Sequence, residues 1–382
     1  MKICLPLKIS IATITTFLCS LLFFLYLQIN FWRCFGLWDT LQVDIFRMLL
    51  AIGCFGLAFK EGWKLEIPKK CINYLVIIVG CGLLIQLVNW RNAIGVTLSA
   101  IITVLWAFVF ATKRIYLVFL YLHIFVLSLV IGYKFYIGED PNLMFQGTSR
   151  NHISILFMMA AAVINIEEFK NNKNITLWPS ILFLVFSVAA AGRGGGICAL
   201  LYMLSISIYK INGLKRKQRI RVVGIILCSG ILIFVFYAPV IFEYIVNLEI
   251  FMRMSGQRIS GNGRELMNVA YLKNINFLTF FYGYEFSANP IFQIEGNLNP
   301  HNSFITLHRL YGFTGIIFLG ILVDAMIRLW KNHMKPYAFI LLVILMRGAS
   351  EQFLFPGEYD FIIVSVLLFS RLYLYGERDV KA

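Results

Sequence analysis

Repeated long apolar runs divide this chain of 382 residues, and they constrain its fold more than any other feature. The longer runs suffice to cross the hydrocarbon layer of a bilayer, which is about 30 Å thick. Hydrophobic residues make up 60% of the chain and charged residues only 14%, more apolar surface than a soluble domain of this size can bury. The runs are continuous rather than alternating, which favours helices over a membrane barrel. The sequence therefore predicts an all-α, polytopic integral membrane protein.

We expect about twelve spans in a single membrane domain that covers residues 1–382. Their approximate bounds are 9–29, 42–59, 72–88, 93–111, 115–133, 153–166, 177–192, 195–209, 222–242, 303–325, 337–347 and 360–375. The first run is long for a signal-peptide core and lacks a small-residue cleavage site, so it is interpreted as a retained span. A polar insertion over residues 239–302 separates spans nine and ten, and we expect a long, partly helical loop there.

The basic residues predict which ends of the spans share a side. Lys and Arg concentrate in short loops, so the net charge of +15 reflects membrane orientation and anionic lipids rather than nucleic acid. The densest cluster, at 210–221, indicates a cytoplasmic loop. With twelve spans, that loop places both termini in the cytoplasm. The acidic stretch 138–142 and the 239–302 loop then lie outside.

Basic residues on the outer side are candidate site residues, because the orientation rule does not explain them. Arg193 lies in the glycine-rich turn 191–196, between spans seven and eight. A forked guanidinium beside free helix amides suits a phosphate or diphosphate, although a snorkelling arginine at a packed hairpin is the alternative. In the long loop, residues 261–264 resemble a turn entering a helix, with Arg264 in its first turn. Arg258 is a weaker candidate, and both arginines have the alternative of being solvated loop residues.

The segment Asn299-Pro300-His301-Asn302-Ser303 opens the tenth span, so His301 is expected at the membrane surface. We expect His308 on the same face, seven residues later. A neutral imidazole can take a proton from an attacking hydroxyl near pH 7, but a lone histidine is also often structural. Further outer candidates are Arg150 and the pair Arg347 and Glu351. If helical, that pair is one turn apart, so a mutual ion pair is the default expectation.

Motifs for metal or nucleotide chemistry are absent from the sequence. It contains no GxxxxGK[ST] motif and no clustered Cys and His ligands, so no metal and no cofactor are expected. A transferase acting outside would therefore take its energy from an activated, lipid-carried donor. Basic residues would offset the charge on the leaving phosphate.

The order of these motifs resembles the bacterial O-antigen polymerase and O-antigen ligase superfamily over about residues 180–325. The order begins with the arginine turn and the basic cytoplasmic loop, followed by Gly-Asn-Gly-Arg at 261–264. Pro-His-Asn-Ser-Phe-Ile from Pro300 and Tyr-Gly-Phe-Thr-Gly from Tyr311 complete it. The turn departs from the family pattern, because it reads Ala-Gly-Arg-Gly where members often have Ser-Arg-Gly.

The resemblance implies a metal-independent glycosyltransferase of the bacterial inner membrane, with the 239–302 loop in the periplasm. Its donor would be a glycan on undecaprenyl diphosphate, its acceptor a lipid-linked repeat unit, and a chain-length regulator a further candidate partner. By motif position, His301 and Arg264 would be catalytic, and Arg193 and Arg264 would contact the diphosphate. Arg150 and Arg347 match positions of the family's motifs more weakly.

The polymerase is preferred over the ligase, which would transfer the same glycan to lipid A-core. A flippase or other transporter is a more remote alternative. It would place charged residues deep within the spans, whereas its main candidates lie near predicted span ends: Asp44, Arg47 and Asp324.

Overall fold

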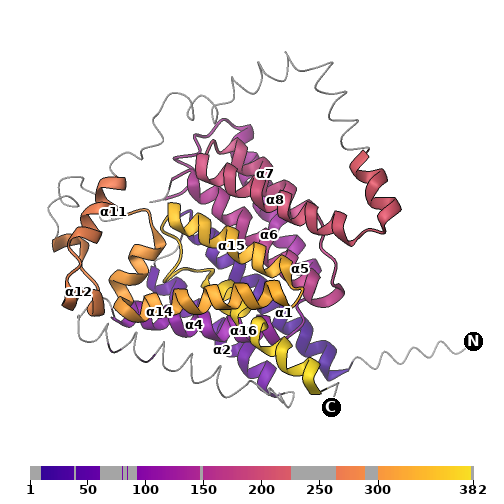
Figure 1. The fold of residues 1–382 in the computed structure, drawn as a ribbon, viewed down its shortest axis with the longest axis horizontal. Coiled ribbons are helices and arrows are strands. Elements are labelled where there is room, and N and C mark those ends of the chain that lie inside the picture. Colours follow the sequence, from indigo (N-terminus) through magenta and orange to yellow (C-terminus); the bar gives the residue numbers. More distant parts are fainter. Residues whose placement is uncertain are drawn as a thin grey trace, which may run out of the picture.

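The protein is an all-helical bundle in a computed structural model that describes residues 10–37, 40–60, 80, 84, 93–146, 149–224, 264–288 and 300–379 (Figure 1). No strand occurs within these ranges, so the predicted fold class is confirmed at this level. The helices are α1 (Ile11–Arg33), α2 (Thr40–Lys60), α4 (Ala93–Thr112), α5 (Leu117–Tyr136), α6 (Asn151–Asn172), α7 (Trp178–Ala189), α8 (Arg193–Gly213), α11 (Arg264–Lys273), α12 (Phe277–Tyr282), the 3-10 turn η1 (Phe286–Ala288), α14 (Ser303–Lys331), α15 (Lys335–Ser350) and α16 (Asp360–Asp379).

Seven of the described helices are long and apolar enough to cross a membrane: α1, α2, α4, α5, α6, α8 and α14. Each coincides with a predicted span. The predicted spans at 177–192, 337–347 and 360–375 appear as the shorter α7, as α15 and as α16. Those at 72–88 and 222–242 lie almost entirely outside the described residues. The membrane character is thus supported, and the count of twelve remains a prediction.

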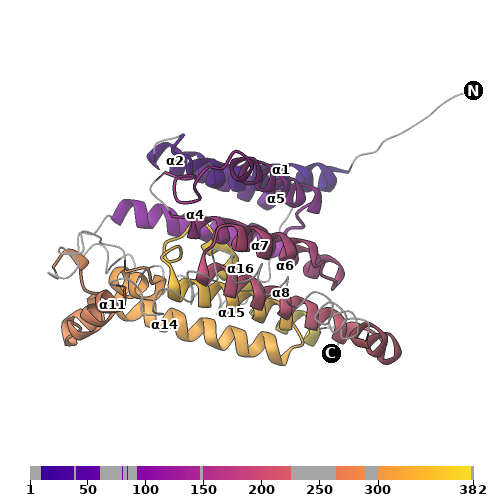
Figure 2. The ribbon, with the colours of Figure 1, turned by 90° about the horizontal axis from the view of Figure 1, so that it is seen from above.

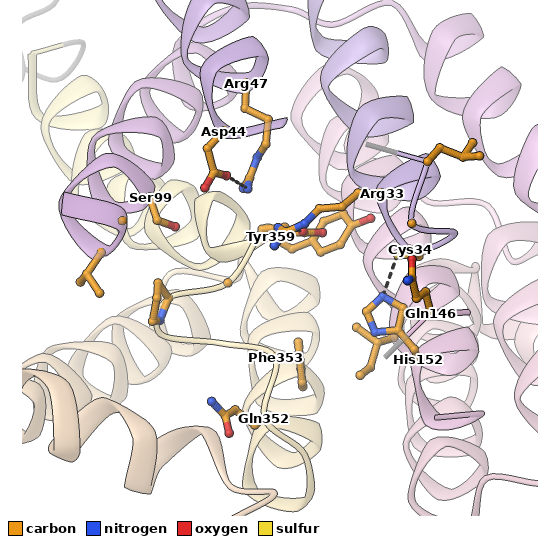
Figure 3. Close-up of a pocket in the computed structure, with 18 residues that line it drawn as sticks. Arg33, Cys34, Asp44, Arg47, Ser99, Gln146, His152, Gln352, Phe353 and Tyr359 are labelled. Atoms are coloured by element: carbon orange, nitrogen blue, oxygen red, sulfur yellow. Dashed lines mark hydrogen bonds and ion pairs between the residues drawn. The ribbon is translucent and has the colours of Figure 1, made fainter. Parts of the chain in front are cut away.

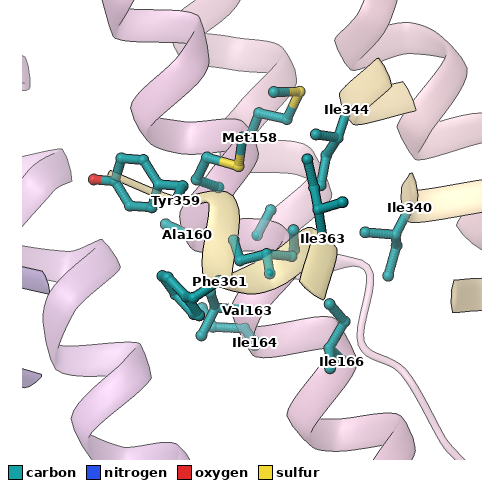
Figure 4. Packing of buried hydrophobic residues seen from close by; sticks show 14 of the residues in the cluster. Met158, Ala160, Val163, Ile164, Ile166, Ile340, Ile344, Tyr359, Phe361 and Ile363 are labelled. Carbon is teal, nitrogen blue, oxygen red and sulfur yellow. The ribbon is translucent and has the colours of Figure 1, made fainter. Parts of the chain in front are cut away.

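The helices pack in three layers, with α6 at the centre (Figure 2). One outer layer contains α1, α2 and α5, and the opposite one contains α8, α14 and α15. Every residue of α6 from Ile153 to Phe169 is buried. Figure 4 shows Met158 and Val163 of this helix packed with Ile344 of α15 and Ile363 of α16.

The outer helices direct large apolar side chains away from the bundle at helical spacing. On α2 these include Phe46, Leu49 and Ile52, which are 54–60% exposed. On α5 they are Val118, Leu122, Phe125 and Leu129. So much exposed apolar surface would be unfavourable in water, whereas lipid chains solvate it without penalty. The exposed stripes therefore agree with a multi-pass membrane protein.

The two ends of the bundle differ in composition. At one end, Lys170 of α6 donates hydrogen bonds to the carbonyls of Phe110 (2.8 Å) and Lys113 (2.7 Å) at the α4–α5 turn. The helix directions place the basic loop at 214–221 at this end too, which we call the basic end. The opposite end, called the site end, gathers the segments 33–37, 142–146, 149–152, 191–195, 300–303 and 350–360. This separation of basic loops from candidate site residues is what the charge distribution predicts.

Helix α14 contains a kink that the sequence did not predict. Gly312 has φ 52° and ψ −136°, a backbone conformation that side-chain-bearing residues rarely adopt. A Cβ at this position would lie 1.9 Å from the carbonyl oxygen of Phe281. The predicted span 303–325 is therefore kinked at Gly312, where α12 packs closely against its backbone, and α14 still has the length and composition of a membrane span.

Candidate functional site

The centre of the candidate site is a hydrogen-bond contact between His301 and Glu351. Nδ1 of His301 lies 2.8 Å from Oε1 of Glu351, and the two side chains are 18% and 9% exposed. The side chain of Asn302 caps α14 by accepting hydrogen bonds from the amides of Phe304 (2.9 Å) and Ile305 (3.3 Å). His301 precedes this cap with φ 51°, in the left-handed region. The cap and the carboxylate thus fix the imidazole at the site end.

The segment after α15 places Glu351 opposite His301. Helix α15 ends at Ser350, and Glu351 has extended backbone. Ser303 Oγ donates to the carbonyl of Glu351 (2.7 Å) and accepts from the amides of Phe353 and Leu354 (3.2 Å each). The helical backbone on which the expected Arg347–Glu351 ion pair depends is therefore not present, because α15 ends at Ser350.

Arg347 is buried beside the site, with only 2% of its surface exposed. Its guanidinium donates to Ser350 Oγ (3.1 Å), to the carbonyl of Asn151 (3.3 Å) and to Ser154 Oγ (3.2 Å). Asn151 in turn donates from Nδ2 to Oε2 of Glu351 (3.3 Å). Arg347 therefore joins the first turn of α6 to the end of α15, and this geometry is that of a positioning residue.

The predicted arginine turn packs against the same cluster. Helix α8 begins at Arg193, whose side chain is half-buried, and Gly192 is its N-cap. A Cβ at Gly194 would lie 2.9 Å from Nη1 of Arg347, and one at Gly195 would lie 2.5 Å from Oγ of Ser154. The glycines therefore allow α8 to approach α6 and α15. The structure thus brings the turn that contains Arg193 next to Arg347 and Ser154, close to the His301–Glu351 pair.

The remaining predicted residues lie in different places. Arg150 is the residue before Asn151, and its Nε donates a hydrogen bond to Oδ1 of Asn142 (2.8 Å). His308 does not share the surroundings of His301, which corrects that expectation. Its Nδ1 lies 2.8 Å from the Tyr271 hydroxyl, and its Nε2 lies 3.1 Å from the Phe280 carbonyl. The cause is the positive φ of His301, which places that residue outside the helix.

The long loop is described only in part. Its residues 264–288 contain α11, α12 and η1. Arg264 is the first described residue of this segment, so the turn predicted at 261–264 lies almost entirely outside the described residues. The side chain of Arg264 and all of Arg258 lie outside the described residues, so their roles remain predictions.

A cavity of about 870 Å³ opens beside the cluster at the site end (Figure 3). It is bounded by Gln352, which follows Glu351, and by His152, which follows Asn151. Two ion pairs line it: Arg33 with Glu358, and Arg47 with Asp44 (2.9 Å). Sequence reasoning considered Arg47 and Asp44 only for a transport path. It missed Arg33 and Glu358, which are 325 positions apart.

Two ionisable groups of the cavity wall stay neutral. Burial, together with the negative charge of Glu358, raises the pKa of the Cys34 thiol. The same causes raise the pKa of the Tyr359 hydroxyl well above its ordinary value. Both groups therefore remain protonated at neutral pH. They can shape the cavity or form hydrogen bonds, but they do not supply a thiolate or phenolate nucleophile.

The chain matches no protein-family model, no curated protein and no solved structure. Within the described part of the chain, no three His, Cys, Asp or Glu side chains gather as a metal site.

Proposed function

We propose that this protein is a membrane glycosyltransferase that polymerises a lipid-linked surface glycan at the outer face of the bacterial inner membrane. The observation that carries the proposal is the His301–Glu351 contact, which is 2.8 Å long; Gln352, the residue after Glu351, lines a cavity of about 870 Å³. A carboxylate on Nδ1 orients an imidazole and favours the tautomer whose basic nitrogen is Nε2. Such a pair is suited to accept a proton from a sugar hydroxyl.

In the proposed reaction, the acceptor hydroxyl attacks the anomeric carbon of a glycan on undecaprenyl diphosphate. The new C–O bond forms as the bond from that carbon to the diphosphate oxygen breaks. The hydroxyl proton passes to His301, and the electron pair of the broken bond leaves with the diphosphate. Arg193 and Arg264 are proposed to offset the charge of that leaving group, because a guanidinium can bind two phosphate oxygens at once.

Replacing Glu351 with Gln tests the proposed role of the carboxylate. Glutamine keeps the shape of the side chain but removes the charge that stabilises the protonated imidazole. We expect polymer formation to fall by at least about tenfold while the protein still accumulates in the membrane. The measurement is the polysaccharide ladder on a gel, normalised to protein by immunoblot.

Glu139→Gln is the matched control. This loop carboxylate at the site end pairs with Lys134 (2.6 Å) and lies outside the proposed site. It should leave the ladder unchanged. Wild-type ladders from the Glu351→Gln variant would contradict a role for the carboxylate in transfer.

The polymerase and ligase alternatives share this site and differ in the acceptor. We expect a deletion strain to carry single repeat units on its lipid A-core, because the polymerase step alone is lost. Loss of all capping, with lipid-linked polymer still present, would instead favour the ligase and reject the polymerase.

The packing between the cavity and the basic end favours a transferase over a transporter. The Phe23 ring lies 5.2 Å from that of Trp106 and 5.4 Å from that of Phe110, and Trp106 also packs on Tyr26 at 4.7 Å. These buried rings fill the space between α1 and α4, toward the basic end. Within the described helices, this packing favours a binding site over a continuous path.

A further inference from the structure

Helix α11 of the outer loop is apolar on two faces, although only one of them packs against the protein. Met267 and Tyr271 are buried in a small core with Phe286 and Ile305. The other face carries exposed leucine and valine side chains at every third position, and these are 42–62% exposed: Leu266, Val269 and Leu272. A helix with apolar side chains on both faces is expected to have apolar surroundings on both.

Helix α12 lies next along the chain and has an even larger apolar surface. Five of its six residues are Phe, Leu or Tyr, and none of the six is buried. Phe277 and Leu278 are 78% and 65% exposed. A contiguous apolar surface of this kind marks a contact with a partner or with a membrane.

The kink of α14 places α12 at the outer boundary of the membrane. After Gly312, α14 continues from Phe313 to Lys331. At 1.5 Å per residue this segment is about 28 Å long, close to the roughly 30 Å of the hydrocarbon layer. The kink therefore lies near the outer edge of that layer. The carbonyl of Phe281 is close to the kink, because a Cβ at Gly312 would lie 1.9 Å from its oxygen.

Polar contacts fix both helices to the first part of α14, beside which they lie in Figure 1. The two ring nitrogens of His308 contact the hydroxyl of Tyr271 (2.8 Å) and the carbonyl of Phe280 (3.1 Å). Arg309 donates to Glu285 (2.7 Å), and this ion pair is partly exposed. A partly exposed ion pair is suited to the polar headgroup region. The direction of the exposed apolar face is thus set by α14.

The apolar surface of α12 continues onto a membrane-spanning segment. The ring of Phe313 lies 5.4 Å from that of Phe280 and 5.5 Å from that of Phe281. Phe313 begins an exposed stripe of α14 that includes Ile316 and Ile317, three and four residues later on the same face. Since lipid chains cover that stripe, the same chains can cover the adjoining face of α12.

We propose that α11 and α12 lie in the outer interface of the membrane, with their exposed apolar side chains among the lipid acyl chains. The partner is the lipid surface, because the exposed face is continuous with the lipid-facing stripe of α14. The part of the loop at 264–282 would then belong to the membrane rather than to the aqueous space outside. This inference does not depend on the proposed glycosyltransferase function.

The test is photo-crosslinking of the full-length protein in nanodiscs of phosphatidylethanolamine and phosphatidylglycerol. The photoreactive residue p-benzoylphenylalanine replaces Leu272 or Leu278, one at a time. Phe125 on α5 is the lipid-facing reference, and Asp140 in the acidic outer segment is the aqueous reference, both being exposed. Mass spectrometry of the intact protein detects lipid adducts, and gel electrophoresis detects covalent dimers.

We expect lipid adducts at Leu272 and Leu278 to be at least about tenfold more frequent than at Asp140, because an interfacial face is buried at the acyl boundary. Their frequency should approach that at Phe125. Adducts as rare as those at Asp140, at either position, would overturn the proposal. Covalent dimers in place of lipid adducts would also overturn it and would assign the face to a second copy of the chain.

Phe277→Asp tests the lipid contact of α12 in a second way. A carboxylate is disfavoured in lipid, so adducts at Leu278 should fall by at least about threefold. The fold should persist, because the Phe277 side chain is largely exposed. Leu143→Asp is the control, since it adds the same charge to an exposed leucine between α5 and α6. It should leave the adducts unchanged, and unchanged adducts in Phe277→Asp would reject the lipid contact.

Discussion

Replacing His301 with Ala is expected to lower glycan transfer by about 10²–10⁴-fold, the usual contribution of a general base. The variant removes the group that is 2.8 Å from Glu351 and leaves the Asn302 cap of α14 in place. The protein should therefore still accumulate in the membrane. The measurement is the polysaccharide ladder, together with the amount of protein in the membrane fraction.

His333→Ala is a closely matched control. His333 also has positive φ, 60° against 51° for His301, so alanine meets a similar backbone preference at both positions. It is exposed and lies between α14 and α15 at the basic end, away from the site. We expect wild-type ladders from this variant. Wild-type ladders from His301→Ala would reject the imidazole as the base.

Replacing Gly195 with Ala should separate α8 from α6 and disable the site without touching any candidate catalytic group. The added Cβ would lie 2.5 Å from both Cβ and Oγ of Ser154, which also accepts a hydrogen bond from Arg347. Overpacking of this kind costs about 1–3 kcal/mol of unfolding free energy. We expect a lower thermal midpoint in detergent and a weaker polysaccharide ladder.

The same helix supplies the control for this substitution. A Cβ at Gly213, at the other end of α8, would meet nothing within 4 Å. Gly213→Ala should leave the thermal midpoint unchanged or raise it slightly, because alanine is favoured over glycine in helices. A wild-type thermal midpoint for Gly195→Ala would contradict the close contact between Gly195 and Ser154.

Most described helices could be predicted from the sequence, because lipid selects long apolar runs. The predicted spans 93–111 and 303–325, for example, begin within one residue of α4 and α14. The kink at Gly312 was not predictable in this way. It depends on the approach of Phe281 from a distant segment, and a glycine within an apolar run does not by itself indicate a break.

The site could be predicted only in part. Arg193 is a candidate because the orientation rule does not explain an outer arginine, and His301 because it opens the tenth span at the membrane surface. The structure brings their segments to one end of the bundle. The partner of His301 was not foreseen, because the pairing depends on where α15 ends. The cavity was missed for a similar reason, since the contact of Arg33 with Glu358 joins the two ends of the sequence.

The buried helix α6 also has a consequence for how the chain enters the bilayer. Its last turns carry Glu167 and Glu168, which would oppose partition of an isolated helix into lipid. The Glu167 carboxylate accepts from the amide of Ile115 (2.8 Å), and that of Glu168 is contacted by Tyr121. These two partners precede α6 and are synthesised first, whereas Lys170 and Thr176, which also contact the carboxylates, lie within and after the helix. The segment from α4 to α5 is therefore expected to assist the insertion of α6, so that early steps of biogenesis prepare the centre of the bundle.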